Sequence, residues 1–255
     1  MATLDTTVGP DQDDDKNLTI LEHLRELRYR VMVAGGALLI CMIASFYPIT
    51  GWVLNWLKRP AENKVENFNL VFTQPLEYWS TFFSVALMVG LAMSMPVIVY
   101  QLLAFIGPGL TRQEKRWVYP ITLGASVMFL FGAAFAYYVE LPPALNFLLD
   151  GQGVADPFIS VKSYVSFVTR MMIVTGIVFE MPLFVMGLAK LGVVQSKKLL
   201  GWWRYAIVGS FVVSALVTPS IDPFTQSLVA IPMVILYFFG ILLAKLVENN
   251  PIIPR

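Results

Sequence analysis

Six apolar stretches, separated by short polar segments, constrain this chain more than any other feature of its sequence. Their expected bounds are 31–47, 75–106, 117–139, 163–189, 205–217 and 228–244. A helix needs about 20 apolar residues to cross a hydrocarbon core of about 30 Å. The 255 residues are 57% hydrophobic and only 14% charged, which excludes a soluble globular domain. We predict an all-α polytopic membrane protein, with residues 18–247 forming a single six-helix domain.

The two segments that flank this domain are short. Residues 1–17 form a tail rich in aspartate that is expected to be disordered, and residues 248–255 form a short C-terminal tail. No small-residue cleavage site follows the first span, so a cleavable signal is not expected.

Lysine and arginine are distributed unequally between the two sides of the membrane. With the N-terminus inside, the inner segments carry thirteen of these residues, and Arg170 lies within a span. The outer segments carry four, namely Lys58, Arg59, Lys64 and Lys162. Cytoplasmic loops are enriched in lysine and arginine. Both termini are therefore predicted to be cytoplasmic.

Some of the spans have unusual lengths. The second is about 32 residues, or roughly 48 Å, so it must tilt, bend or protrude, and Pro96 is the expected bending point. The fifth, 205–217, is only about 20 Å long, and the sixth is expected to be not much longer. This pair is expected to thin the bilayer, unless tilted neighbours shield it.

Two segments between spans are predicted to be short helices on the outer surface. Residues 51–60 place Trp52 and Trp56 one helical turn apart, and Pro60 is expected to end that helix. Residues 141–150 carry a proline near their first turn. Both segments are expected to act as interfacial anchors.

Charged residues inside spans are costly and often functional. Glu180 lies deep in the fourth span, next to Pro182, and Arg170 lies about 15 Å earlier on the same helix, too far for a direct pair. Three roles for Glu180 stay open: a neutral hydrogen-bonded group, the lining of a polar cavity, and a proton carrier. From the sequence pattern alone, Gln101 and Gln226 are interpreted as ordinary polar residues that pack between helices.

No signature of catalysis, cofactor binding or metal binding is found. The chain lacks the metalloprotease, serine-hydrolase and P-loop motifs, and its lone Cys41 excludes an intrachain disulfide. The lone His23 has no second histidine to form a metal site and is expected on a helix surface. Gly35 and Gly36 are expected to allow close helix packing. The net charge of +1 gives no reason to expect a nucleic-acid partner.

Two acids stand among basic residues at the predicted cytoplasmic edge. Glu26 lies in 23-HLRELRYR-30, and Glu114 lies in 111-TRQEKR-116. Together they form a candidate receptor for a partner with two arginines. On spacing alone, Glu26 can instead pair with Arg30 at i,i+4, and Glu114 can form a capping box with Thr111.

Several stretches in order resemble the TatC family, the multi-spanning subunit of the twin-arginine protein translocase. The resemblance covers roughly residues 17–247. It departs at Gly109, often alanine in the family, and in an outer loop at 61–69. It rests on 23-HLRELRYR-30, Pro60, 95-MPVIVYQLLAFIGPGL-110, 114-EKR-116, 134-AFAYYVELPPAL-145, 164-YVSFV-168, 176-GIVFEMP-182 and 217-VTPSIDPFTQSLVAIP-232.

The resemblance implies a cup-shaped fold with short fifth and sixth helices. It also implies a receptor, not an enzyme, that binds the Arg-Arg signal peptide of folded cargo. With TatA- and TatB-type single-span partners, and in several copies, such a receptor exports cargo using the proton-motive force, in a membrane expected to be the bacterial inner membrane. The implied roles are signal-peptide binding by Glu26, Glu114, Phe105 and Gln101, an intramembrane polar pocket at Glu180 and Arg170, partner contact at Asp222 and Gln226, and structural roles for Pro60 and Pro96.

Two other classes stay open on the residues. A proton-coupled secondary transporter would also explain an acid within a span, but such transporters usually contain internal repeats, and none is found here. A membrane scaffold without cargo recognition would need neither Glu26 nor Glu114.

Overall fold

A computed structural model of the protein describes residues 20–62, 72–106, 118–150, 160–190, 194–218 and 222–248. The tail 1–17 and all but the first residue of 248–255 lie outside these ranges. The helical elements in chain order are α1 (Ile20–Phe46), α2 (Thr50–Glu62), α3 (Glu77–Ile106), α5 (Val118–Phe135), the π-helix η2 (Ala136–Glu140), α6 (Leu141–Asp150), α7 (Val161–Lys190), α8 (Ser196–Gly201), α9 (Trp203–Val217) and α10 (Pro223–Glu248).

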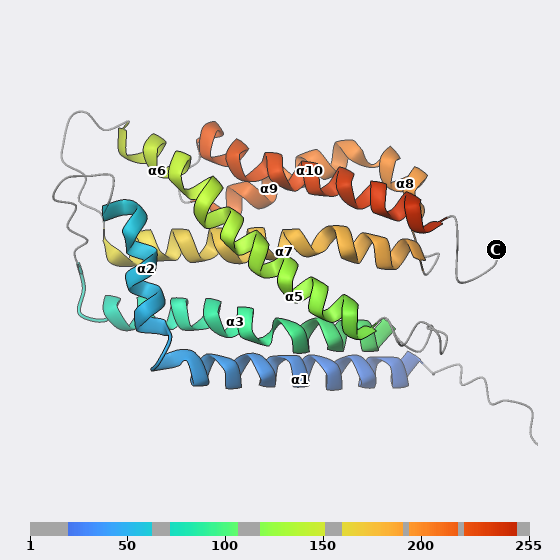
Figure 1. The fold of residues 1–255 in the computed structure, drawn as a ribbon, viewed down its shortest axis with the longest axis horizontal. Helices are drawn as coiled ribbons and strands as arrows, with labels where there is room; N and C mark the ends of the chain where they lie inside the picture. The colour runs from blue at the N-terminus through green and yellow to red at the C-terminus, as the bar shows by residue number, and fades with distance from the viewer. Residues whose placement is uncertain are drawn as a thin grey trace, which may run out of the picture.

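The long helices form a bundle around α7, which contacts α3, α5, α9 and α10. α1 lies against α3 at one side of this bundle, and α5 crosses it at an angle (Figure 1). One end of the bundle carries α2, α6 and the start of α7, and we call it the α2 end (Figure 1). The other end, the α8 end, carries α8, the start of α1 and the end of α10 (Figure 1). The shorter α9 stops before it reaches the level at which α7 begins (Figure 1).

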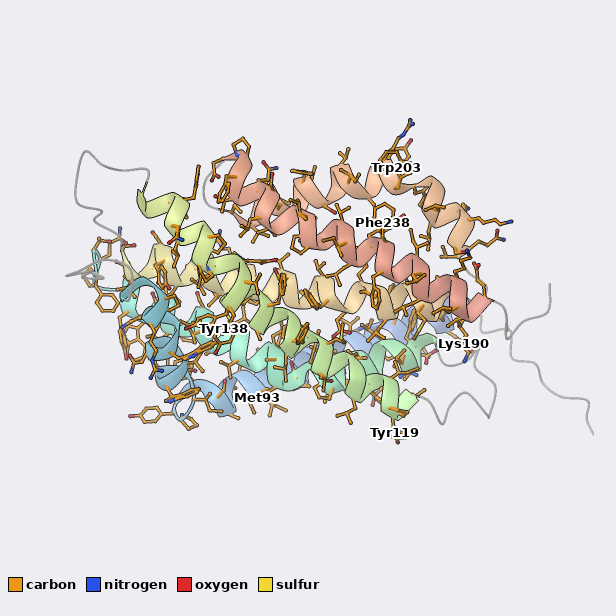
Figure 2. The ribbon with its side chains drawn as sticks, turned by 45° about the horizontal axis from the view of Figure 1, so that its top comes forward. Met93, Tyr119, Tyr138, Lys190, Trp203 and Phe238 are labelled. Carbon is orange, nitrogen blue, oxygen red and sulfur yellow. The ribbon has the colours of Figure 1, made fainter. Side chains whose placement is uncertain are left out.

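Five helical segments are long and apolar enough to cross a membrane: α1, α3, α5 through α6, α7 and α10. α9 is a sixth apolar helix of 15 residues, or about 22 Å. Large apolar side chains cover the outside of the bundle, as expected where a protein meets lipid. Met93, Tyr119, Tyr138, Trp203 and Phe238 are examples, all at least 40% exposed (Figure 2). The predicted all-α, six-helix class is confirmed.

Close approach of the helices depends on small residues at particular positions. A Cβ atom added to Gly90 of α3 would lie 2.8 Å from the Cα of Met42 in α1, and one added to Gly132 of α5 would lie 2.8 Å from Phe179 in α7. Lipid tails are as apolar as the helix surfaces, so packing between helices in a membrane relies on such contacts. Gly35 and Gly36 do not serve this purpose, because a Cβ added to either would meet no atom within 4 Å. The expectation of close packing at that pair was wrong.

Two helices extend beyond their predicted apolar spans. α1 begins at Ile20 and not near residue 31, because the charged residues before the apolar span continue the same helix. α10 has 26 residues, about 39 Å, and is therefore not the short sixth helix that was predicted. The carboxylate of Asp222 accepts a hydrogen bond from the Thr225 backbone N–H at 2.7 Å and starts the helix early. Only α9 is short enough for the predicted bilayer thinning.

Proline residues sit inside helices without ending them at once. α2 continues through Pro60 to Glu62, two residues beyond its predicted end, and α3 is one helix on both sides of Pro96.

Trp52 is 68% exposed, as an interfacial anchor should be, whereas Trp56 stacks on Tyr137 with ring centroids 3.8 Å apart. The two tryptophans of the predicted surface helix therefore have different environments.

Candidate functional site

The predicted ion pair of α1 is present at the α8 end. The Glu26 Oε1 atom accepts hydrogen bonds from Arg30 Nε at 2.9 Å and from Arg30 Nη2 at 2.5 Å. Both side chains are close to one quarter exposed. Among the described residues, the other Glu26 carboxylate oxygen accepts no hydrogen bond. Glu26 is thus held by a single side-chain partner that can move away.

Arg30 connects this pair to α3. Its Nη1 atom donates to the Gln101 Oε1 atom at 3.3 Å. One turn further along α3, the Phe105 ring stacks on His23 of α1 with centroids 4.4 Å apart. The structure therefore brings together three of the four residues expected in the signal-peptide site. The fourth, Glu114, lies outside the described residues, as does its predicted capping box with Thr111.

The sequence analysis placed His23 on a helix surface but gave it no part in this site. His23 is exposed, and its ring covers one face of Phe105. The partners are 82 positions apart in the chain, so no local pattern reports the contact. The only hint in the sequence that a residue such as His23 could belong to this site was the prediction that Phe105 does.

An apolar groove opens beside the ion pair, between the parts of α1 and α3 that lie toward the α8 end. Its volume is about 340 Å³. Gly35 contributes an open stretch of backbone to it, because nothing lies where its Cβ would be. A carboxylate that can exchange its cation, next to an apolar groove, can take a guanidinium and the apolar segment that follows it. The lining residues are Leu27, Arg30, Val31, Ala34, Gly35, Leu38, Ile98, Gln101, Leu102 and Phe105.

Glu180 does not form one polar pocket with Arg170. Glu180 is half-buried, and its Oε1 atom has no hydrogen-bond partner among the described residues. Arg170 is exposed and lines a different cavity, at the α2 end, of which Glu180 is not a part. Their grouping into a single site stays a prediction that this geometry does not favour.

A second buried acid was missed by the sequence analysis. Glu140, in the π-helix, is 1% exposed and accepts a hydrogen bond from the Thr175 hydroxyl at 2.9 Å, while its Oε1 atom has no partner in the described part of the chain. A lone acid between two apolar stretches was the available signal. Burial of an acid in a membrane span is costly, and π-helices are frequent at functional positions.

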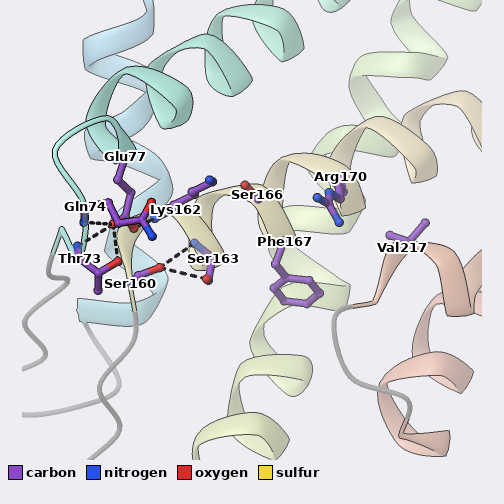
Figure 3. Close-up of a pocket in the computed structure, with 10 residues that line it drawn as sticks. All are labelled: Thr73, Gln74, Glu77, Ser160, Lys162, Ser163, Ser166, Phe167, Arg170 and Val217. Carbon is purple, nitrogen blue, oxygen red and sulfur yellow. Dashed lines mark hydrogen bonds between the residues drawn. The ribbon is translucent and has the colours of Figure 1, made fainter.

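A third acid, Glu77, joins the starts of two helices at the α2 end (Figure 3). It is 3% exposed. Its Oε2 atom accepts hydrogen bonds from the backbone N–H groups of Thr73 at 2.6 Å and Gln74 at 3.2 Å, and from the Thr73 hydroxyl at 2.8 Å. Its Oε1 atom accepts the backbone N–H of Lys162, in the first turn of α7, at 2.9 Å. An acid at the start of the predicted span 75–106 was the sequence signal for this cap.

The two residues expected to contact a partner are both used within the chain. Asp222 accepts hydrogen bonds from the backbone N–H and the hydroxyl of Thr225. The Gln226 side chain donates to the Phe211 carbonyl at 2.8 Å, and the Ser214 hydroxyl donates to the Gln226 carbonyl at 2.6 Å. The bonds of Gln226 join α9 to α10, those of Asp222 cap α10, and partner contact stays a prediction.

Comparison with known proteins connects this geometry to a family. Residues 22–232 match the family described as Sec-independent protein translocase protein (TatC). A chloroplastic TatC of Arabidopsis thaliana is 40% identical over 91% of this chain and 68% of its own length. The TatC of Aquifex aeolicus is 39% identical over 91% of this chain and 97% of its own.

Solved structures agree with the sequence relatives. A crystal structure described as a twin-arginine translocase receptor, TatC, superposes with a TM-score of 0.81 at 39% identity, and covers 89% of this chain and 99% of the other. A second crystal structure of such a receptor, in DDM, also gives a TM-score of 0.81, at 40% identity over 88% of this chain and 100% of the other. The likeness therefore extends over nearly all of the described bundle.

Proposed function

This chain belongs to the TatC family, and from that premise we propose that it is the receptor of a twin-arginine translocase, binding the Arg-Arg signal peptide of folded precursor proteins. As a TatC protein it is an integral multi-pass membrane protein and a component of a Sec-independent protein translocase, not an enzyme. The proposal concerns what the chain recognises and with which residues.

The exchangeable pair of Glu26 and Arg30 carries this proposal. Arg30 occupies the carboxylate with its own guanidinium, in the position that a signal-peptide arginine would take. Arginine forms bidentate, charge-assisted pairs with carboxylates, whereas lysine offers only a point charge, so the site would favour arginine over lysine. Such hydrogen bonds contribute about 1.5–3 kcal/mol each when well formed, and 0–1 kcal/mol when exposed.

The adjoining groove supplies the rest of the affinity. In this proposal the two arginines bind Glu26 and Glu114, and the apolar part of the signal lies in the groove between α1 and α3. Each apolar side chain buried there contributes about 1.5–3 kcal/mol. Gln101 and Phe105 lie at the boundary between the charged pair and the groove and would position the peptide at that point.

The same proposal places the receptor in a larger assembly. Single-span TatA- and TatB-type proteins would act with several copies of this chain, driven by the proton-motive force, with contacts at Asp222 and Gln226. The excess of lysine and arginine in segments near the α8 end supports a cytoplasmic location for that end, where precursors arrive. An inner membrane of a bacterium fits this arrangement.

Binding of a twin-arginine signal peptide to the purified protein tests the proposal. We expect Glu26→Gln to weaken binding by about tenfold or more, because the substitution removes the charge but keeps the shape. Glu114→Gln should do the same, since glutamine can still serve in a capping box. A peptide with Lys-Lys in place of Arg-Arg should bind the unchanged protein weakly and be insensitive to Glu26→Gln.

Other functions give different results in the same measurements. Glu22→Gln, on the exposed side of α1, is the matched control and should not change binding. Equal binding of Arg-Arg and Lys-Lys peptides to all variants would show that neither acid is a receptor, as a scaffold requires. Proton-dependent solute uptake into liposomes that contain only this protein would favour the transporter.

A further inference from the structure

A polar groove lies at the α2 end, opposite to the site described above. Its volume is about 400 Å³, and α7 supplies half of the residues that line it (Figure 3). Three serines of this wall, Ser160, Ser163 and Ser166, present hydroxyl groups, and two cations, Lys162 and Arg170, line the same cavity. Ser163, Ser166 and Arg170 are spaced at i, i+3 and i+7, so they share one face of α7.

Arg170 has no counter-charge in the described part of the chain. Within those residues the Glu26–Arg30 pair is the sole salt bridge, and neither Arg170 nor Lys162 donates a side-chain hydrogen bond. Arg170 lies nine residues into α7, about 13 Å along a membrane-spanning helix. A charged side chain at that depth is costly unless it is paired or hydrated. Within the described residues, the groove therefore contains a cation without a counter-charge.

Glu77, the acid that lines the same groove, does not supply the missing counter-charge for Arg170. Four hydrogen-bond donors, three of them backbone N–H groups, already occupy its two oxygens. Glu77 and these donors lie at one side of the groove, and Arg170 lies at the other, beside Val217 (Figure 3). Within the described residues, the groove thus offers an anion an unpaired guanidinium, an unpaired ammonium and the hydroxyls of Ser163 and Ser166.

The short α9 ends at the Arg170 side of the groove. Val217, the last residue of α9, lines the groove next to Arg170. α9 stops before the level at which α7 begins, so it does not run along the first turns of α7 (Figure 1). Arginine side chains near a helix end extend toward the headgroups. The Arg170 side chain can therefore extend from that depth toward the headgroups, on the side where Lys162 lines the groove.

We propose that this groove binds the phosphate of an anionic phospholipid headgroup, from the leaflet at the α2 end. Arg170 binds the phosphate oxygens in the bidentate geometry that guanidinium favours, and Lys162 attracts the headgroup from above. The Ser163 and Ser166 hydroxyls donate hydrogen bonds to the remaining phosphate or glycerol oxygens, while the Ser160 hydroxyl donates to Ser163. The lipid tail lies along the surface that α9 leaves open. This site is separate from the proposed signal-peptide site and does not depend on it.

Titration of the purified full chain with phosphatidylglycerol, followed by native mass spectrometry, tests this proposal. Arg170→Gln should weaken binding of the tightest lipid by about tenfold, and Arg170→Lys should recover part of the loss. Arg204→Gln is the matched control, since Arg204 is an exposed arginine on α9 whose guanidinium lies over the Trp203 ring. It should leave the affinity unchanged.

Several results would overturn the proposal. Equal losses for Arg170→Gln and Arg204→Gln would show that anionic lipid binds by net charge alone. Displacement of the lipid by inorganic phosphate at similar concentration would identify free phosphate as the ligand. Should Arg170→Gln fail to fold, Lys162→Gln replaces it, and an unchanged lipid affinity for that variant contradicts the proposal.

A photocrosslinking amino acid at Ser166, in native membranes, separates a lipid from a protein ligand. An adduct with the mass of an anionic phospholipid, lost in Arg170→Gln, is the expected result. A protein adduct that depends on Arg170 would show that an acidic group of a partner helix occupies the groove, and the lipid assignment would be wrong.

Discussion

The two ends of this bundle each combine an acid with an arginine, in opposite ways. At the α8 end, Glu26 is held by one side chain, Arg30, and an apolar groove lies beside the pair. At the α2 end, Glu77 accepts hydrogen bonds mainly from backbone N–H groups, and Arg170 in the same groove has no partner among the described residues. A side-chain partner can be exchanged for a ligand, whereas backbone donors cannot leave without unfolding the helix starts. The first acid is suited to recognition and the second to structure.

The same substitution at both acids tests whether their roles differ in this way. Glu77→Gln should cause the largest loss of stability, because an amide nitrogen would face N–H donors from the starts of α3 and α7. Glu26→Gln removes one partly exposed ion pair and should lower the unfolding free energy by only about 0–1 kcal/mol. Thermal unfolding of the two variants in detergent measures the contrast. Equal melting temperatures would contradict the structural assignment of Glu77.

Filling the groove separates its contribution from that of the charged pair. Gly35→Leu should weaken binding of a twin-arginine signal peptide by about tenfold, because a leucine takes space that an apolar peptide side chain would bury. Gly36→Leu is the control, since Gly36 does not line the groove and its Cβ would also meet nothing within 4 Å. Equal effects of the two changes, measured by peptide titration, would remove the groove from the site.

Removal of the internal competitor should act in the opposite direction. Arg30→Gln frees the Glu26 carboxylate, and we expect the signal peptide to bind about two- to fivefold more tightly, the equivalent of a lost pair of up to about 1 kcal/mol. Isothermal titration with Arg-Arg and Lys-Lys peptides measures the change. Weaker binding to this variant would mean that Arg30 contacts the ligand directly and does not compete with it.

The smallest effect is expected at Gln101. Its contact with Arg30 is long, at 3.3 Å, so Gln101→Leu should change the peptide affinity by less than about twofold. The same titration gives the value. A loss as large as that of Glu26→Gln would make the Gln101 amide a direct ligand of the signal and would shift the centre of the site toward α3.

Sequence reasoning succeeded where the relevant partners are close in the chain. The pair of Glu26 and Arg30 is four residues apart on one helix and was among the stated alternatives. It failed where the partners are distant: Glu77 meets Lys162 across 85 positions, and Glu140 meets Thr175 across 35. A single sequence contains no signal for such contacts, so both acids were overlooked.

The ends of the helices were also not predicted correctly from the sequence, for a different reason. Apolar patterning located the spans, because the membrane dictates which residues it accepts. It did not locate the helix ends, since α10 begins at a cap made by Asp222, and at its other end Glu248 accepts a hydrogen bond from the Ser196 backbone N–H. The Asp222 cap and the Glu248 contact with the start of α8 both lie outside the apolar window, and for that reason the sixth helix was predicted too short.

The π-helix at Ala136–Glu140 changes the phase of the helix that contains it. Each residue of an α-helix advances the side chain direction by about 100°, so one extra residue in a single turn rotates everything that follows by that amount. α6 therefore presents Phe147 toward Phe224 of α10, with ring centroids 4.7 Å apart. Deletion of one residue from this turn would keep the span helical while turning the α6 surface away from α10. An insertion of one residue is thus part of how α5 and α6, one continuous rod, contact two different neighbours.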